Sequence, residues 1–449
     1  MLPFRTKQTK FLGQSEGLNI ITGKGKRTRN VAREIETPTS SNSAPTRSSR
    51  MNFLLIAIAA LTFMLFLGPV LSKRSKRHAS IAVPDDSFVV AGYLPEYRLY
   101  VDLEYAGQHL TDLLLFSAEP KADGDVKLHW GDLDIRRAMA LKRRNPKLRL
   151  HLTLGGGGRS SYFPNICTDS GLRRRLVNRL ASLVQIYGLS GINFDWEVPQ
   201  TPSQVGGYVR LLHEAHALLP SDLIVSVALH PGQNLGGAGY GSVDMVMLMA
   251  YDMSFGKGGV GHSDMDLMNR AVKELIKEGV PKEKIILGVP GYGRREGEVK
   301  SYAELIDDQA KQHTGEYEND FDKKPHSELL PAGFKLRSEM KGFMFDSLMT
   351  AQRKTAFAKM RGLGGVFLWE VGQDKFVPGV SLIEGMMLVG NGSKKLSQAE
   401  MTIGGGRSDK SNFKTAEHEE VGSRKQRRRR EREEREKRAR ARGGGDGEL

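Results

Sequence analysis

The stretch at residues 190–197, Ser-Gly-Ile-Asn-Phe-Asp-Trp-Glu, alternates apolar and polar side chains with period two from its third residue onward. Successive side chains of a β-strand point to opposite faces. The apolar face holds Ile192, Phe194 and Trp196. The polar face holds Asn193, Asp195 and Glu197. A half-exposed antiparallel strand with a wet polar face has the same alternation, so the pattern alone leaves both interpretations open.

Helical patterns flank this strand, over residues 168–187 before it and 204–218 after it. Alternation of helices and strands predicts a parallel sheet that is covered by helices. In a closed parallel barrel neither face of a strand meets bulk water, so polar groups there are costly unless they form a site near the strand's C-terminal end. Glu197 lies at that end, which favours a functional site.

Apolar runs of strand length alternate with amphipathic stretches through the middle of the chain. The eight runs cover residues 88–94, 113–117, 148–154, 191–196, 223–229, 243–250, 285–289 and 364–368. Further helical candidates cover residues 133–143, 265–277 and 347–360. The count and the alternation predict an α/β fold, a (β/α)8 TIM barrel, although a doubly wound open sheet has the same alternation.

Composition divides the chain into five segments. They are a disordered basic arm (1–50), a transmembrane signal-anchor helix (51–72), a linker with a candidate basic processing site (73–85), the barrel (86–390) and a charged, Arg/Glu-rich tail (391–449). The uncharged run from Met51 to Leu71 is about as long as a bilayer-spanning helix. It begins some fifty residues into the chain, so an anchor is favoured over a cleaved signal peptide.

We therefore expect a single-pass membrane protein of the secretory pathway or cell surface, held in the membrane through residues 51–72, with a luminal or extracellular barrel. Release by cleavage after Arg77 is an alternative, because residues 74–77 resemble a furin-type processing site. A plain basic flank that stops translocation explains the same residues. The basic residues on both sides of the run leave its orientation ambiguous.

The net charge of +15 belongs to the ends of the chain. Residues 1–77 carry an excess of 11 basic side chains and residues 394–449 an excess of 6, which leaves −2 for the middle. A nearly neutral central domain suits a neutral polysaccharide better than a polyanion, so we expect no nucleic-acid partner. Cys167 is the only cysteine, so the fold holds no disulfide within the chain.

Residues 190–197 resemble the signature of family 18 glycoside hydrolases, the chitinases, which reads Asp-Gly-x-Asp-x-Asp-x-Glu on the fourth barrel strand. Gly191, Asp195 and Glu197 match it, Asn193 occupies a position that admits Asn, and Ser190 departs from it. Five further motifs resemble the family's other strands in order. They are Gly92-Tyr93, Thr153-Leu154-Gly155-Gly156, Met249-Ala250-Tyr251-Asp252, the Gly-Val-Pro-Gly-Tyr-Gly-Arg of residues 288–294, and the strand that ends in Trp369.

The resemblance implies a retaining, substrate-assisted hydrolysis of β-1,4-linked N-acetylglucosamine in chitin or chitooligosaccharides, by a monomer without a metal or organic cofactor. It implies that Glu197 is the acid and then the base, that Asp195 holds the acetamide N–H, and that Tyr251 donates to the acetamide oxygen. The implied sugar-binding residues are Tyr93, Asn193, Asp252, Tyr292, Arg294 and Trp369. A related glycosidase of N-glycans or peptidoglycan, or a chitin-binding lectin without activity, is the alternative.

Other features limit the resemblance or stay structural. Ser190 and Asn193 remove two charges that many members carry, which we expect to shift the coupled titration of Asp195 and Glu197. The roughly fifty residues between Arg294 and Phe345 suggest that the family's extra α+β lobe is missing, which predicts a shallow groove and internal, endo-type cleavage. His230 follows a strand without a partner at metal-ligand spacing, so we interpret it as structural.

Overall fold

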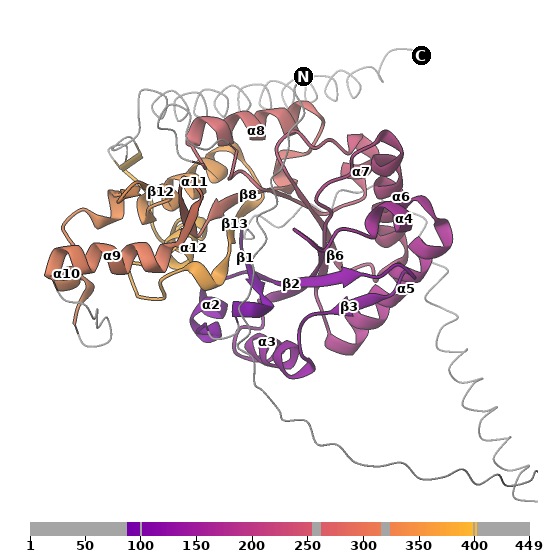
Figure 1. The fold of residues 1–449 in the computed structure, drawn as a ribbon, viewed down its shortest axis with the longest axis horizontal. Coiled ribbons are helices and arrows are strands. Elements are labelled where there is room, and N and C mark those ends of the chain that lie inside the picture. The colour runs from indigo at the N-terminus through magenta and orange to yellow at the C-terminus, as the bar shows by residue number, and fades with distance from the viewer. Residues whose placement is uncertain (1–87, 99–100, 254–261, 316–323, 398–399, 402–449) are drawn as a thin grey trace, which may run out of the picture. The chain divides into compact units, whose positions relative to one another are not determined.

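The structure, a computed structural model, describes residues 88–98, 101–253, 262–315, 324–397 and 400–401 (Figure 1). The segments predicted for residues 1–50, 51–72 and 73–85 lie outside these ranges, as does most of the tail predicted for residues 391–449. Within the described ranges, no helix combines the length and the apolar character that a membrane span needs.

Eight parallel strands close into a barrel, as the alternation of the sequence predicts. They are β1 (Val89–Pro95), β2 (Asp112–Pro120), β4 (Arg149–Gly155), β5 (Gly191–Asp195), β6 (Ile224–Leu229), β7 (Met245–Leu248), β8 (Ile285–Pro290) and β13 (Gly365–Trp369). Pairing of β1 with both β13 and β2 closes the ring. The short strand β3 (Val126–Leu128) extends the sheet antiparallel to β2. Closure excludes the doubly wound open sheet.

Helices lie outside the ring of strands (Figure 1). They are α2 (Leu103–His109), α3 (Asp132–Arg144), α4 (Phe163–Thr168), α5 (Ser170–Tyr187), α6 (Pro202–Leu218), α7 (Gly236–Gly241), α8 (Met265–Lys277), α11 (Leu348–Arg361) and α12 (Leu382–Gly390). Short 3₁₀ turns are η1 (Glu96–Arg98), η2 (Lys282–Lys284), η3 (Phe334–Leu336) and η4 (Val371–Gln373).

Local signals in the sequence set the ends of these helices. Asp169 caps α5 by accepting a hydrogen bond from the backbone N–H of Leu172, and Gly188 ends the helix in the left-handed conformation with φ 59°. Ser347 and Gly362 do the same for α11. The observed helices therefore begin and end within two residues of the predicted ranges 168–187 and 347–360.

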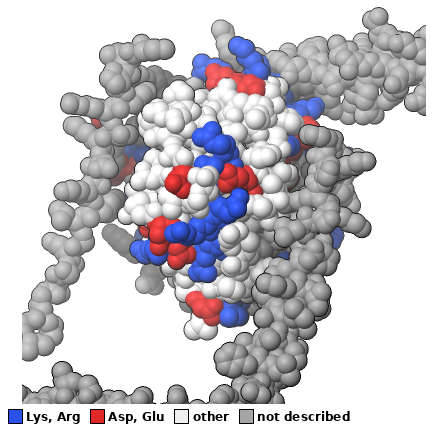
Figure 2. All heavy atoms as spheres, turned by 90° about the vertical axis from the view of Figure 1, so that its right-hand side faces the viewer, with Lys and Arg blue, Asp and Glu red and all other residues white. Residues whose placement is uncertain are grey.

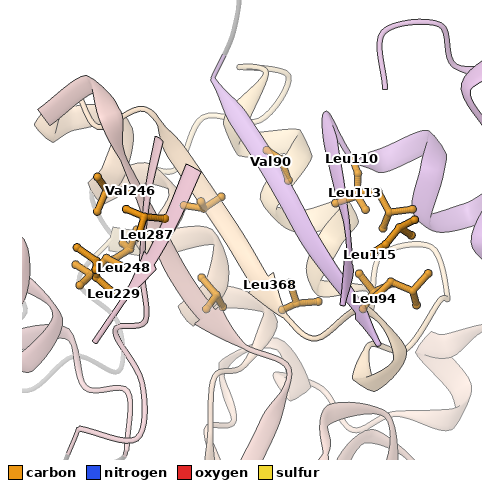
Figure 3. Close-up of a cluster of buried hydrophobic side chains, with 14 of the residues drawn as sticks. Val90, Leu94, Leu110, Leu113, Leu115, Leu229, Val246, Leu248, Leu287 and Leu368 are labelled. Carbon is orange, nitrogen blue, oxygen red and sulfur yellow. The ribbon is translucent and has the colours of Figure 1, made fainter. Parts of the chain in front are cut away.

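The strand alternation separates two apolar layers. Odd-numbered residues of β1, such as Ala91 and Tyr93, line the inside of the barrel, and even-numbered ones, such as Val90 and Leu94, pack outward against the helices. Figure 3 shows part of the outer layer, in which Val90 and Leu94 lie near Leu113 and Leu115 of β2. This outer layer is the main core, so the inside of the barrel is free to carry polar groups.

The region between Tyr292 and Phe345 corrects one prediction. It forms a four-stranded antiparallel sheet with two helices, an α+β lobe that lies to one side of the ring of strands (Figure 1). Its elements are β9 (Tyr292–Arg295), β10 (Glu298–Ser301), α9 (Tyr302–Thr314), α10 (His326–Leu329), β11 (Glu339–Met340) and β12 (Phe343–Phe345). The prediction that fifty residues are too few for such a lobe is wrong. The shallow groove and the endo-type cleavage were inferred from a missing lobe, so that argument no longer supports them.

Charged side chains of both signs share the barrel's surface. Figure 2 shows Lys and Arg next to Asp and Glu on the face that is turned to the viewer. Ion pairs such as Arg179 with Asp125, 3.0 Å apart, and Arg173 with Glu214, 2.8 Å apart, join neighbouring elements. The mixture agrees with the nearly neutral charge of the central segment.

Candidate active site

Strand β5 carries two carboxyl groups to the C-terminal end of the barrel. Asp195 is its last residue, and Glu197 follows after one residue. The backbone N–H of Glu197 donates to the Ser160 Oγ over 3.1 Å, which fixes the chain where it leaves the strand. A Cβ on Gly155 would lie 2.3 Å from the carbonyl oxygen of Asp195, so only glycine lets β4 approach so closely here.

Asp195 is buried without the partners that a buried carboxylate normally has. Its side chain points into the barrel, the residue is 3% exposed, and its Oδ1 has no hydrogen-bond partner among the described residues. Burial raises the pKa of Asp195 well above its usual value, and the charge of Glu197 raises it further. A buried carboxyl with an unused oxygen, at the C-terminal end of a barrel strand, is a candidate for binding a ligand's hydrogen-bond donor.

Asn193 is held in place by residues of two other strands, Tyr93 of β1 across the barrel and Ser226 of the adjacent β6. Its Oδ1 accepts a hydrogen bond from the Tyr93 hydroxyl over 3.0 Å, and its Nδ2 donates to the Ser226 Oγ over 2.9 Å. Burial raises the pKa of Tyr93 well above its usual value, so the phenol keeps its proton and acts as a donor. Asn193 therefore lies beneath Asp195 as a neutral group whose amide oxygen and nitrogen each have a hydrogen-bond partner.

Aromatic side chains form one wall of the site. The Trp369 ring, at the end of β13, lies with its centroid 4.8 Å from that of Phe116 and 5.5 Å from that of Tyr93, both in edge-to-face geometry. Trp369 is only partly buried. Tyr251, which follows β7, packs edge-to-face on Phe367 with centroids 6.2 Å apart. Burial raises the pKa of Tyr251 well above its usual value, so its hydroxyl also stays a donor.

Asp252, Tyr292 and Arg294 are brought together, but mainly to bind one another. Asp252 accepts hydrogen bonds from Arg294 Nε over 2.5 Å and Nη2 over 2.8 Å, and from the Tyr292 hydroxyl over 2.8 Å. Burial raises the pKa of Asp252, but hydrogen bonds from His262 and Arg294 outweigh that effect and lower it to about 2. The buried His262, which we did not predict from the sequence, also belongs to this cluster. Its Nδ1 lies 3.0 Å from Asp252 Oδ1.

Ser190 lies away from the site, which corrects the expectation that it alters the titration of the carboxyl groups. It precedes β5 at the opposite end of the strand, and its Oγ accepts a hydrogen bond from Lys142 Nζ of α3 over 3.0 Å. Counting by twos from Asn193 places residue 190 on the outward face. Of positions 190 and 193, only the neutral Asn193 can therefore influence Asp195 and Glu197 directly.

His230 lies at the site, although we interpreted it as structural from the sequence. It directly follows β6, and its Nε2 is 3.2 Å from Glu197 Oε2. The partner is 33 residues away in the sequence, so no spacing rule could have paired them. Among the described residues, no group of three His, Cys, Asp or Glu side chains is arranged to hold a metal ion.

The sequence profile of glycosyl hydrolases family 18 matches residues 89–374, which include every strand of the barrel and every site residue above. The chain belongs to this family. It is a chitinase-like glycoside hydrolase, with its carboxyl groups where the barrel's active end lies.

Individual relatives are distant in sequence but cover most of the barrel. The chain is 22% identical over 344 residues to "Probable chitinase 2" of Drosophila melanogaster, an alignment that covers 66% of this chain and 70% of that one. A family 18 chitinase structure from Flavobacterium johnsoniae matches with TM-score 0.56 and 19% identity, over 71% of this chain and 98% of that one. A Cycas revoluta chitinase structure in complex with (GlcNAc)3 matches with TM-score 0.54 and 20% identity, over 68% and 99%.

Proposed function

We propose that this family 18 enzyme hydrolyses β-1,4 linkages between N-acetylglucosamine units in chitin or chitooligosaccharides, with retention of the anomeric configuration. The observation that carries the proposal is the pair Asp195 and Glu197, of which Asp195 is buried and has an oxygen without a hydrogen-bond partner among the described residues. Relatives named as chitinases and a related structure that binds (GlcNAc)3 support the choice of substrate.

Glycosidic bond cleavage needs a proton for the leaving oxygen and a partner for the anomeric carbon. In the proposed mechanism Glu197 protonates that oxygen while the C1–O bond breaks. The acetamido oxygen of the same sugar bonds to C1 and gives an oxazolinium ion, so the substrate supplies its own nucleophile. Water then bonds to C1 as Glu197 takes a proton from it, and the acetamido oxygen is released.

Asp195 stabilises the intermediate by accepting a hydrogen bond from the acetamide N–H with Oδ1, which has no partner among the described residues. Its negative charge in a buried position offsets the positive charge that develops on the oxazolinium ion. The Tyr251 hydroxyl donates to the acetamide oxygen and places it below C1. The Trp369 ring forms the apolar floor under the sugar, because a pyranose presents C–H groups that pack on an aromatic face.

Asp252, Tyr292 and Arg294 act as one preassembled unit in this proposal. Their mutual hydrogen bonds hold each polar group in place before the sugar chain arrives, which removes part of the entropic cost of binding. The guanidinium and carboxylate edges that remain exposed then bind hydroxyl groups of neighbouring sugars. Tyr93 and Asn193 support Asp195 from below and have no direct sugar contact in this scheme.

The test is release of a fluorophore from chitobiose and chitotriose glycosides by the full-length protein and by Glu197→Gln. A matched control is Glu283→Gln, the same substitution at an exposed residue of η2, before β8 at the other end of the barrel. We expect turnover by the wild type and the control, and a loss of at least roughly a thousandfold in Glu197→Gln. Wild-type protein that binds chitin but turns nothing over would support a lectin instead.

We also propose that residues 51–72 anchor the enzyme in a membrane of the secretory pathway or cell surface, with the barrel luminal or extracellular. The support is the uncharged run of the sequence from Met51 to Leu71. Alkaline carbonate extraction of membranes that contain the full chain tests it. An anchored protein stays in the pellet, and a protein released after Arg77 is found in the soluble fraction as a shorter species.

A further inference from the structure

The imidazole of His230 lies against the carboxyl group of Glu197, the proposed acid. Strand β6 delivers His230 to the C-terminal end of the barrel, directly beside β5. Its backbone N–H donates to Gln233 Oε1 over 2.5 Å, which holds the turn after the strand. From this position its Nε2 reaches to 3.2 Å from Glu197 Oε2.

The two oxygens of Glu197 have different surroundings. Oε2 is the oxygen against His230. Oε1 lies on the side of the loop after β4, because a Cβ on Gly157 would be 3.9 Å from it. The imidazole therefore occupies one oxygen and leaves the other available to carry and deliver a proton.

We propose that His230 is the positioning residue for Glu197: its Nε2–H donates to Oε2 and orients the carboxyl group so that Oε1 holds the catalytic proton. This inference rests on the proposed function. When Glu197 gives that proton to the glycosidic oxygen, it becomes a carboxylate, and a hydrogen bond to a charged acceptor is stronger than one to a neutral acceptor. His230 thus stabilises the product of proton transfer more than the resting acid, which lowers the barrier.

The other titratable groups around Glu197 cannot supply this contact. Among the described residues, those that interact with it are Asp195 at the end of β5, Tyr93 on β1 and Tyr251 after β7. Asp195 offers no hydrogen-bond donor when it is ionised, and the Tyr93 hydroxyl donates to Asn193. The Tyr251 hydroxyl has the acetamide oxygen as its acceptor in the proposed mechanism, so the imidazole of His230 is left as the donor to Glu197 Oε2. Asn193 cannot replace it, because Tyr93 and Ser226 already engage its amide.

Two substrates that differ in their leaving group distinguish this role from simple packing. Both place a chitobiose unit on the non-reducing side of the bond that is cleaved. Chitotetraose releases a sugar alkoxide, which must be protonated as it leaves. The 2,4-dinitrophenyl glycoside of chitobiose releases a stable anion, which needs no proton. Since kcat/KM reports the steps up to bond cleavage, loss of a group that assists Glu197 as an acid should affect chitotetraose alone.

The variants are His230→Ala, His230→Gln and, as a matched control, His213→Ala at an exposed position of α6. For His230→Ala we expect kcat/KM on chitotetraose to fall roughly ten- to hundredfold, with less than about threefold change on the dinitrophenyl glycoside. His230→Gln keeps an N–H donor and should recover most of the loss. Added imidazole should partly restore His230→Ala on chitotetraose, and His213→Ala should match the wild type.

Equal losses on both substrates, or no loss on either, overturn the role of His230. Failure of His230→Gln to recover activity, in a variant whose thermal unfolding matches the wild type, also counts against a hydrogen bond to Oε2. Wild-type protein inert on both substrates contradicts the proposed function itself, and this inference falls with it. An active wild type with unaffected His230 variants contradicts the inference alone.

Discussion

Two aspartates inside the barrel are equally buried but have opposite surroundings. Asp112, at the start of β2, is fully buried; its Oδ1 lies 2.7 Å from His151 Nε2, and its Oδ2 accepts from Arg149 Nη2 and Thr111 Oγ1, each over 2.6 Å. Asp195, at the end of β5, has an oxygen, Oδ1, for which the described part of the chain offers no hydrogen-bond partner. Burial raises the pKa of both carboxyl groups, but His151 and Arg149 bring that of Asp112 down to about 2.

The difference between the surroundings of these two aspartates indicates where the barrel uses buried polar groups for stability and where it uses them for function. At the N-terminal ends of the strands, the buried carboxylate of Asp112 has ion-pair and hydrogen-bond partners. A buried charge without such partners would destabilise the fold. At the C-terminal ends, the carboxyl group of Asp195 keeps an acceptor oxygen to which a substrate can donate a hydrogen bond. Activity and stability, measured on the same variants, should separate the two ends of the barrel.

The largest effect should come from Asp195→Asn. The substitution keeps the shape of the side chain but removes the charge that offsets the oxazolinium ion, so we expect kcat/KM to fall roughly a hundred- to thousandfold. The melting temperature should stay the same or rise, because a buried carboxyl without a partner at Oδ1 becomes neutral. Activity within threefold of the wild type would show that Asp195 has no role in the reaction.

Asp112→Asn should have the opposite profile. It leaves the partly exposed Arg149 without its counter-charge and weakens the contact of the buried Asp112 site with the buried His151, so we expect a loss of about 3 kcal/mol in the free energy of unfolding. Activity per folded molecule should stay within about twofold, since the residue lies at the other end of the barrel. Denaturant titration and active-site titration measure the two quantities, with Asp125→Asn at a half-exposed position as the control. An Asp112→Asn variant that is inactive but as stable as the wild type would contradict the assignment of stability to one end of the barrel and function to the other.

The same two variants should change the pH dependence of stability with opposite sign. The folded pKa of Asp112 is about 2 against an ordinary 3.8, so its contribution is present above about pH 4 and is lost as the pH falls toward 2. This amounts to about 2 kcal/mol, and Asp112→Asn should flatten that part of a melting-temperature profile. The raised pKa of Asp195 costs stability as the pH rises, so Asp195→Asn should gain most at neutral pH. Identical acid profiles in all three proteins would contradict the assignment.

Asn193→Asp tests how far the unpaired state of Asp195 depends on its neutral neighbour. A second carboxylate below Asp195 should raise the pKa of the pair, which moves the pH-rate curve to higher pH by about one unit. We expect the rate at the optimum to change by less than about tenfold, because Tyr93 still donates to the same position. A curve that superimposes on the wild type's would show that position 193 does not influence the reacting groups.

Ser190→Asp should have the smallest effect. The new carboxylate would lie near Lys142, outside the barrel, and a partly exposed ion pair contributes about 0 to 1 kcal/mol. Turnover and its pH dependence should match the wild type within experimental error. A shifted pH-rate curve would mean that this position communicates with Asp195 after all.

The sequence predicts the barrel well because its signals are local and repeated. Period two in residues 191–196, helical patterns on either side and eight apolar runs all point to the same closed sheet. The same rule of alternation also places Ser190 on the outer face, an implication that our motif-based expectation overlooked. Gly191 has a physical reason that only the structure reveals, since a Cβ there would lie 2.1 Å from His151 Nδ1.

Contacts between distant strands and very short elements could not be read in this way. His230 and Glu197 meet because β5 and β6 pair in parallel register, and a lone histidine after a strand has no sequence signal for that partner. The lobe uses strands of two to four residues, which are too short for a periodic pattern. The contacts of Asp252 could not be predicted from the sequence either, because its cluster joins residues from three separate segments.

The central claim is that the substrate's acetamido group, held by Asp195, is the nucleophile that Glu197 assists. The most direct measurement is kcat/KM for a series of aryl glycosides of chitobiose whose reducing-end acetamido group carries zero, one, two or three fluorine atoms. Fluorine withdraws electrons from the acetamido oxygen, so the account predicts a steady fall of more than about tenfold across the series. A flat series, with rates unchanged by fluorine, would contradict participation of the acetamido group and with it the proposed role of Asp195.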